Sequence, residues 1–287
     1  MSSKKAPRAD SSSSGLTGPM RLMWARGPLL FTLGVALCVL AFGTFWVWQA
    51  VGKRVLESPQ YRLEPHQISI NAPPEWITAD DLRKESLRNA SLDRSLSIMD
   101  EQLTERIALA FAAHPWVARV ERVEKFHPAK VEVQLLYRRP VASVAIGDDL
   151  WPVDATGVLL PRENLSRAAL AKLPQIGGIE DRPATRPGNI WQDMRVRGGS
   201  RIAEALGDSW QEFGLAQIAP YHSTASQRQP ASFKLVTRGG KQIDWGRQPL
   251  DDDPSEPTPT EKVKRLKSWI QQHGSLDGVA LRPAARR

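Results

Sequence analysis

A run of 22 uncharged, mostly apolar residues near the N-terminus limits what this chain can fold into more than any other feature. It extends from Leu29 to Ala50 (LLFTLGVALCVLAFGTFWVWQA), with Arg26 before it and Lys53 after it. As a helix it would be about 33 Å long, which matches the roughly 30 Å hydrocarbon core of a membrane. A cleaved signal peptide would have a shorter apolar region, of about 7–15 residues, and a small-residue cleavage site. We therefore predict one uncleaved membrane-spanning helix over residues 29–50.

The charges around this run predict its orientation. Residues 1–28 hold five Lys or Arg and one Asp, which is +4 of the formal net charge of +8. Positive flanks remain in the cytoplasm, so we expect residues 1–28 to be a disordered, basic cytoplasmic tail. The foldable part of the chain would then lie outside the inner membrane. Its charges are of mixed sign, which argues against nucleic-acid binding, and Cys38 inside the span leaves it without a disulfide, as a bacterial periplasm allows.

After a linker over residues 51–65, the chain predicts a small module over residues 66–140. A strand is expected at 66–72, and a helix should begin at Thr78, whose hydroxyl can cap it. Over residues 100–113 the apolar positions repeat at helical spacing, and the helix should stop before Pro115. The apolar positions of this helix are Leu103, Ile107 and Phe111.

Two strands complete the module. Residues 117–126 form the first, His127-Pro128 the turn, and alternating apolar residues from Val131 to Leu135 indicate a second strand with one wet face. The order is β-α-α-β-β. Trp116, directly after the helix stop, is predicted to anchor the core.

Residues 141–282 predict a second, mostly β domain with two helical segments. Asp154 to Gly157 reads as a turn between apolar strands, and residues 200–213 as a helix. A hairpin is expected from Ser232 to Trp245, with its turn at 238–241. Thr258 and Glu261 form a capping box for a last helix that ends at Gly274. The fold class is therefore α+β, and residues 283–287 form a tail.

The order of these pieces resembles the FtsQ/DivIB family of bitopic bacterial division proteins, whose first outer domain is a POTRA domain. The resemblance covers roughly residues 29–282 and includes RRPVA (138–142), LWPVDATGVLLP (150–161) and LPQIGG (173–178). An added residue between Val120 and Val123 departs from the family and predicts a β-bulge. A second departure is Ala280 near the end, where the family tends to have Asp. The matching positions with a structural role are Pro115, Trp116, Val117, Pro128, Arg139, Pro140, Asp154 and Gly157.

The resemblance implies a non-enzymatic scaffold of the division machinery. FtsB- and FtsL-like membrane-anchored proteins would bind the C-terminal strands, and other division proteins the POTRA domain. An open sheet edge offers unpaired backbone groups to such a partner. The positions expected to bind it are Phe233, Leu235, Val236, Val279, Leu281 and Arg282.

No sequence pattern predicts a catalytic residue, a cofactor or a metal. The five histidines show no ligand spacing. Residues 251–253 (DDD) read as a solvated loop rather than a cation site, and residues 238–241 as a hairpin turn rather than a phosphate cradle. At 198–200 (GGS) we expect a plain helix start rather than an anion site.

Two other classes of function stay open. A POTRA adaptor in envelope protein transport or assembly is the first alternative, although the chain has no room for the membrane barrel that follows such modules. A membrane-anchored envelope enzyme is the second, and no catalytic constellation supports it.

Overall fold

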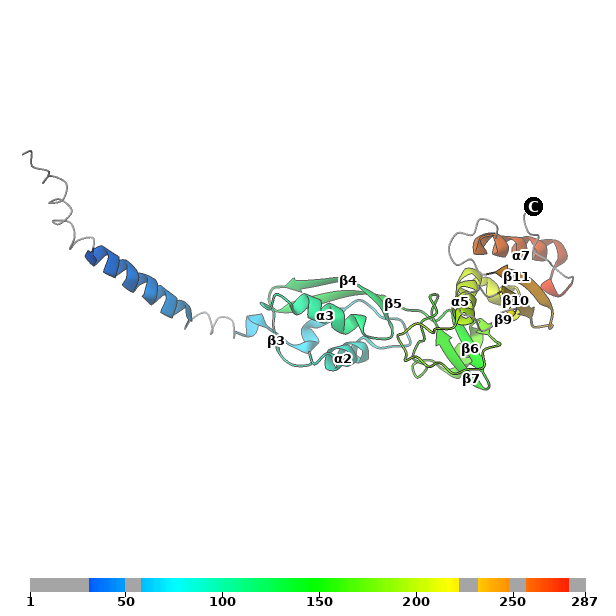
Figure 1. Cartoon of the computed structure of the whole chain (residues 1–287), viewed down its shortest axis with the longest axis horizontal. Coiled ribbons are helices and arrows are strands. Elements are labelled where there is room, and N and C mark those ends of the chain that lie inside the picture. Colours follow the sequence, from blue (N-terminus) through cyan, green and yellow to red (C-terminus); the bar gives the residue numbers. More distant parts are fainter. Residues whose placement is uncertain (1–30, 50–57, 222–231, 248–256, 279–287) are drawn as a thin grey trace, which may run out of the picture. The chain divides into compact units, whose positions relative to one another are not determined.

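The computed structural model describes residues 31–49, 58–221, 232–247 and 257–278. The chain divides into two compact units, Met1–Pro59 and Gln60–Arg287. It is a mixed α+β protein with one N-terminal apolar helix and a sheet-rich body (Figure 1).

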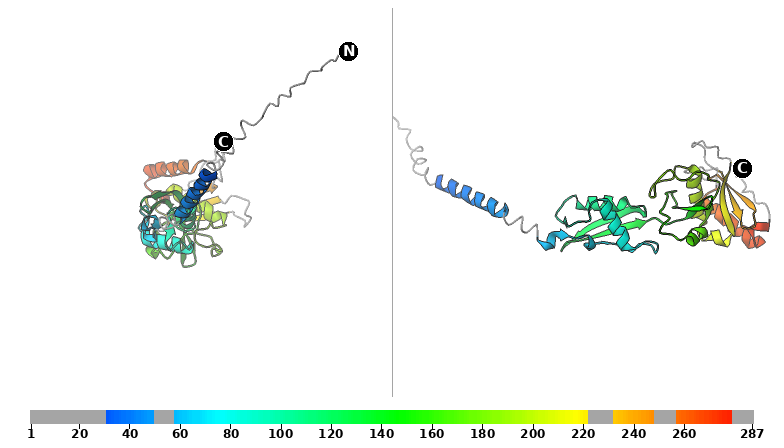
Figure 2. Two further views of the ribbon diagram at one scale, coloured as in Figure 1. Left: turned by 90° about the vertical axis from the view of Figure 1, so that its left-hand side faces the viewer. Right: turned by 90° about the horizontal axis from the view of Figure 1, so that it is seen from below.

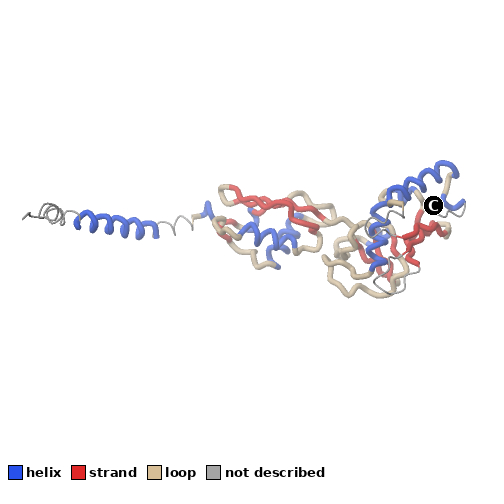
Figure 3. The backbone as a smooth tube through the Cα atoms, turned by 45° about the horizontal axis from the view of Figure 1, so that its top comes forward, coloured by secondary structure: helices blue, strands red, loops and turns tan. Residues whose placement is uncertain are grey.

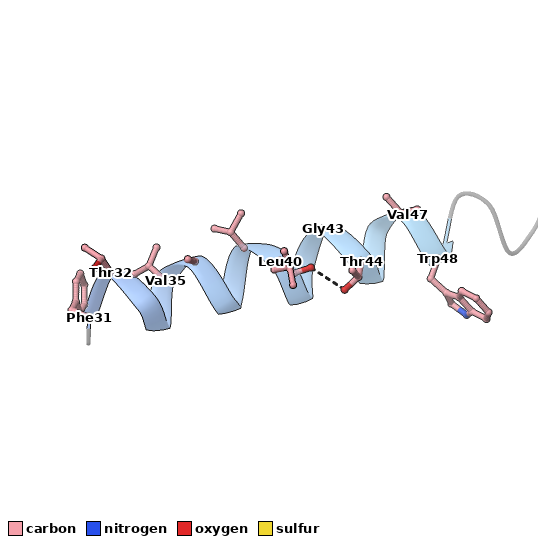
Figure 4. A pocket seen from close by; sticks show the side chains of 10 residues that line it. Phe31, Thr32, Val35, Leu40, Gly43, Thr44, Val47 and Trp48 are labelled. Carbon is pink, nitrogen blue, oxygen red and sulfur yellow. Dashed lines mark hydrogen bonds between the residues drawn. The ribbon is translucent and has the colours of Figure 1, made fainter. Parts of the chain in front are cut away.

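The N-terminal helix extends over Phe31–Gln49, and all of its residues are exposed. Its mean hydropathy is 1.9, and it is long and apolar enough to cross a membrane. A core helix of a soluble protein would be mostly buried, whereas a signal sequence would pass the same test. One face carries the side chains in Figure 4, where the Thr44 hydroxyl donates to the Leu40 carbonyl, 2.9 Å away. The rest of the predicted span, residues 29, 30 and 50, lies outside the described residues.

The first part of the body contains a three-stranded sheet of order β2-β5-β4. The central strand β5 pairs with β2 in parallel and with β4 antiparallel. A separate two-stranded pair, β1-β3, was not predicted. The elements are η1 (Pro59–Tyr61), β1 (Arg62–Leu63), η2 (Pro65–Gln67), β2 (Ile68–Ile70), α2 (Ala79–Asn89), β3 (Leu96–Ser97), α3 (Leu103–Ala112), β4 (Val117–Phe126) and β5 (Lys130–Tyr137).

Helices α2 and α3 lie on one face of this sheet (Figures 1 and 2). The predicted stripe of α3 is fully buried there, at Leu103, Ile107 and Phe111. The alternating residues of β5 complete the core from the sheet side. Thr78 caps α2 as expected, since its hydroxyl accepts from Asp81 N–H at 3.1 Å.

Strand β4 contains the predicted bulge. Its pairing with β5 shifts register between Val120 and Arg122, so Glu121 is the extra residue. A second shift falls between Val117 and Arg119. Both irregularities lie on an outer strand, where an extra residue disturbs pairing on one side only.

The second part of the body is built on a six-stranded sheet of order β11-β10-β9-β8-β6-β7. Strands β6, β8 and β9 run parallel to one another, and the other neighbours are antiparallel. Figure 3 shows the strands of the two sheets as separate groups. The elements are β6 (Ala142–Ile146), β7 (Asp149–Val153), α4 (Arg167–Lys172), β8 (Gln175–Ile176), α5 (Met194–Leu206), α6 (Ser209–Glu212), β9 (Leu215–Tyr221), β10 (Ser232–Thr237), β11 (Gln242–Arg247), α7 (Pro259–His273) and η3 (Leu276–Gly278).

The helix expected over residues 200–213 is wrong in both bounds. Helix α5 begins at Met194, where the Asp193 side chain accepts from Arg195 N–H, and it ends before Gly207, whose φ is +46°. A separate short helix, α6, follows, and α4 was not predicted. This part of the chain therefore contains more helix than the sequence suggested.

The glycines at 198 and 199 lie inside α5, and neither starts the helix. Gly199 is needed because a Cβ there would stand 2.9 Å from Ile176 Cδ1 on β8. Ser200 is buried, and its hydroxyl donates to the Val196 carbonyl at 2.8 Å. The close packing of α5 on β8 thus outweighs the usual preference for glycine at helix ends. Both interpretations of residues 198–200, as a plain helix start and as an anion site, are therefore wrong.

Two local predictions for the last part of the chain are confirmed. Strands β10 and β11 form the expected hairpin. The Thr258 hydroxyl accepts from Glu261 N–H while the Glu261 carboxylate accepts from Thr258 N–H, which is the capping box, and Gly274 ends α7 in the left-handed conformation. Leu266 of α7 packs into the second core.

Candidate protein-interaction edge

In the described residues the six-stranded sheet ends at β7 on one side and β11 on the other, and the C-terminal end of the β7 edge is covered. Pro152 lies within β7 and has no backbone N–H to offer. Its carbonyl accepts from Leu160 N–H at 2.9 Å, and Val153 forms a bridge with Leu159. The segment after β7 therefore folds back and occupies that edge.

Within the described residues, no strand pairs with the outer side of β11. Thr237 N–H donates to the Lys241 carbonyl at 2.9 Å across the hairpin. Because the direction of backbone groups alternates along a strand, Ile243 faces β10, whereas Gln242 and Asp244 direct their N–H and C=O groups away from the sheet. In the described part of the chain, no strand lies beside the outward backbone groups of this stretch.

Side-chain contacts fix the end of β11 from Asp244 to Arg247. The Asp244 carboxylate accepts from the Tyr221 hydroxyl at 2.7 Å and from Gly246 N–H at 3.0 Å. Lys262 of α7 is 4% exposed; its ammonium donates to the Arg247 carbonyl at 3.1 Å and lies 5.3 Å from the Trp245 ring centroid. The far end of β11 is thereby fixed against α7.

The hairpin turn is fixed by η3. Thr237 hydrogen-bonds the Asp277 carboxylate, and the Lys241 ammonium donates to the Asp277 carbonyl at 3.2 Å. A Cβ on Gly239 would stand 2.7 Å from an Asp277 carboxylate oxygen, so a larger residue there would displace that carboxylate. These contacts leave the backbone of Gln242 and Asp244 between two anchored ends.

The residues predicted to bind a partner are placed differently from what the sequence suggested. Phe233 and Leu235 are fully buried on β10, which is paired on both sides by β9 and β11. Val236 on the same strand is half-buried. Phe233 and Leu235 belong to the second core, and the outer strand of the sheet in the described residues is the neighbouring β11. Val279, Leu281 and Arg282 lie outside the described residues.

The predicted structural residues gather where the first core meets the loop after β7. Trp116 is 1% exposed, and its indole N–H donates to Asn164 Oδ1 at 3.1 Å. Trp76, which the sequence did not place, packs against Trp116 with ring centroids 5.7 Å apart. Pro115 and Gly188 are in close contact, because a Cβ added to Gly188 would stand 3.1 Å from Pro115 Cα.

Arg138 has a structural role that the sequence analysis missed. Its guanidinium lies 2.6 Å from the Asp154 carboxylate, and both side chains are mostly buried. The other Asp154 oxygen accepts from the backbone N–H groups of Thr156 and Val158, and Gly157 has a φ of +81°. The adjacent Arg139 forms an exposed pair with Glu204 instead. The sequence feature that could have indicated this ion pair is an acidic residue in a turn, Asp154, downstream of the Arg-Arg-Pro run at 138–140.

Other predicted positions have no direct part in the edge. Val117 is buried at the start of β4, whereas Pro128 follows a cis peptide bond in the β4–β5 turn. Pro140 is half-buried, two residues before β6.

His114 is a buried titratable group next to this core. Its Nδ1 accepts from Trp116 N–H at 3.3 Å, and its Nε2 lies 3.4 Å from the Glu85 carboxylate. Burial lowers the pKa of His114 and outweighs the opposite effect of Glu85. Burial therefore favours the neutral imidazole over the charged one.

The described residues contain no group of three or more His, Cys, Asp or Glu placed to hold a metal ion. Residues 238–241 form the tight turn of the hairpin, as predicted. Residues 251–253 lie outside the described residues.

Comparison with protein-family models and with curated proteins finds no match for this chain.

Proposed function

We propose that the chain is a non-enzymatic, single-pass scaffold of the bacterial division machinery, of the FtsQ/DivIB type. In this proposal residues 1–28 are cytoplasmic, residues 29–50 cross the inner membrane, residues 66–140 form a POTRA domain, and residues 141–282 form the partner-binding β domain in the periplasm. The exposed apolar helix Phe31–Gln49 and the order β2-α2-β3-α3-β4-β5, in which the short β3 pairs only with β1, support it.

One observation carries the functional part of the proposal: the six-stranded sheet is covered at the C-terminal end of β7 and open, within the described residues, at β11. A membrane-anchored division protein would add a strand to β11 through the backbone groups of Gln242 and Asp244. Such pairing depends on main-chain donors more than on side chains. No such site is offered at Leu235, because its backbone is already paired.

The test uses two substitutions at one position in the full chain. Gln242→Ala keeps the outward N–H and removes the side chain, whereas Gln242→Pro removes the N–H itself. We expect wild-type levels of FtsB- and FtsL-like proteins to be captured from crosslinked dividing cells with Gln242→Ala, and at least tenfold less with Gln242→Pro. Circular dichroism on the same preparations checks that both variants are folded.

The outcomes separate the possible functions. A folded Gln242→Pro variant with undiminished capture would rule out strand addition at β11. Capture of outer-membrane transport clients in place of division proteins would favour the transport adaptor. Turnover of an envelope substrate by the purified chain would favour an enzyme.

A further inference from the structure

The junction between the three-stranded and the six-stranded sheet depends on the contacts of one residue, Trp116. Residues 138–141 connect the end of β5 to the start of β6. The Trp116 carbonyl accepts from Arg138 N–H in this connection at 2.8 Å. The Trp116 indole N–H donates to Asn164 Oδ1, in the loop that follows β7, at 3.1 Å. Trp116 therefore joins the first sheet both to the connecting segment and to the second domain.

The backbone N–H of Trp116 is held by His114. It donates to the Nδ1 atom of the imidazole at 3.3 Å, and the His114 side chain is 2% exposed. A ring nitrogen that accepts a hydrogen bond carries no proton, whereas both nitrogens of a charged imidazole are donors. The contact between His114 and Trp116 therefore requires the neutral ring, with its proton on Nε2.

The other ring nitrogen of His114 faces Glu85 of α2. Its Nε2 lies 3.4 Å from the Glu85 carboxylate, and the Glu85 side chain is 58% exposed. Burial lowers the pKa of His114, and among the described residues Glu85 is the one charged group that acts on it, in the opposite direction. Neither α3, which ends just before His114, nor β4, which begins just after Trp116, adds a charged group that changes this pKa.

The two protonation states of His114 favour different contacts. A second proton would be added at Nδ1, which would then point a donor at the Trp116 N–H, and two donors form no hydrogen bond. The charged ring would still be attracted to the Glu85 carboxylate through Nε2. The neutral ring thus holds Trp116, and the charged ring holds Glu85 and releases Trp116. Histidine is the side chain whose ordinary titration falls in the range where such a change is physiological.

We propose that His114 is a pH-sensitive switch that controls the junction between the two sheets. The neutral ring fixes Trp116 and, with it, the contacts to Arg138 and Asn164. Protonation releases Trp116, so that residues 138–141 become a hinge between two folded parts. The two sheets would move as one body near neutral pH and separately in acid. This inference does not depend on the proposed scaffold function.

The test measures the distance between the two parts of the body in the full chain, reconstituted in nanodiscs. Nitroxide labels are placed at Arg88→Cys on α2 and Gln271→Cys on α7, both exposed positions, in a Cys38→Ser background. Electron double resonance between pH 7.5 and 5 should show one narrow distance distribution that is replaced by a broader one in acid. We expect the broad population to grow roughly fivefold or more, with a midpoint below about pH 6.5.

Three variants connect the response to His114. His114→Gln keeps an acceptor for the Trp116 N–H and takes up no proton, so the distribution should stay narrow at every pH. Glu85→Gln removes the partner of the charged ring and should move the midpoint to lower pH. His127→Gln, at an exposed histidine in the β4–β5 turn, is the matched control and should respond as the unsubstituted chain does. Because Glu85 is exposed, its variant tests the switch even if His114→Gln does not fold.

An unchanged narrow distribution from pH 7.5 to 5 would overturn the proposal. A response that persists in a folded His114→Gln variant would do the same, as would a midpoint that stays or rises in Glu85→Gln. Circular dichroism at each pH provides the last check, because loss of secondary structure in step with the broadening would mean unfolding instead of hinge opening. None of these measurements involves a division protein or β11, so failure here and failure of the scaffold role are distinguishable.

Discussion

Strands β4 and β11 both lie at the edge of a sheet, yet they present that edge in opposite ways. Strand β4 has ten residues, two register shifts and five charged side chains, which are Arg119, Glu121, Arg122, Glu124 and Lys125. Strand β11 has six residues and two charged ones, of which Asp244 turns its carboxylate back to Tyr221 and Gly246. The single register shift of the β10–β11 pair falls near Trp245, so the stretch from Gln242 to Asp244 is regular.

The difference means that β4 is protected against pairing with another chain, whereas the regular part of β11 is not. Bulges twist a strand away from a flat partner, and charges oppose the approach of another chain. Strand β4 combines both devices over its whole length. Strand β11 lacks them where its backbone groups point outward, which is why we place the proposed partner there.

The largest expected effect concerns how β4 is anchored. Trp116 precedes β4 and is among the largest fully buried side chains. Trp116→Ala should lower the free energy of unfolding by about 3–5 kcal/mol, because it leaves a large cavity. Thermal unfolding of the full chain checks this, with Trp116→Phe as the control that keeps most of the volume and loses the bond to Asn164. An unchanged Tm for Trp116→Ala would contradict the burial of this side chain and its role in anchoring β4.

The next prediction compares an interior strand with the edge strand. Leu235→Pro should cost about 3 kcal/mol or more, because proline removes a ladder hydrogen bond from a strand paired on both sides. Gln242→Pro should cost much less, since its N–H points away from β10. Urea unfolding of the two variants measures both. Equal losses of stability would show that β11 is not an open edge.

A smaller effect on stability, which depends on pH, is expected from His114 in residues 66–140, the part of the chain that contains β4. The pKa of His114 is lowered from its ordinary 6.5, so the unfolded chain binds the proton more readily than the folded one. This contribution to stability is present above about pH 6.5 and is lost as pH falls toward the folded-state pKa. Unfolding followed between pH 7.5 and about 5 should show stability decreasing with acidity, and His114→Gln should flatten that dependence. A slope that persists in His114→Gln would assign the effect to another group.

The smallest change in stability is expected when the charges of β4 are removed. Arg122 and Glu124 are joined by an exposed ion pair at 2.5 Å. Replacing both with Thr should alter stability by no more than about 0.5 kcal/mol. It should nevertheless increase concentration-dependent self-association, measured by analytical ultracentrifugation, because the edge loses part of its protection. If the double variant stays monomeric at every concentration tested, the bulges alone protect β4.

The sequence by itself determined the features that depend on neighbouring residues. The apolar stripe of α3, the alternation of β5, the bulge at Glu121, the β10–β11 hairpin and the capping box of α7 were all predicted and are all observed. Each arises from the spacing of side chains within one element or one turn, which can be read along the chain. The same holds for the apolar N-terminal helix.

Only the tertiary structure decided what lies next to what. Gly199 is inside a helix because Ile176 leaves no room for a Cβ, and Leu235 is interior because β9 pairs with β10 on the side away from the hairpin. The pairing of Arg138 with Asp154 likewise joins residues on either side of the β6–β7 hairpin. A sheet edge is a property of strand order, and strand order is set by the packing of whole elements, so the outer position of β11 among the described strands could not be read from the pattern of any single segment.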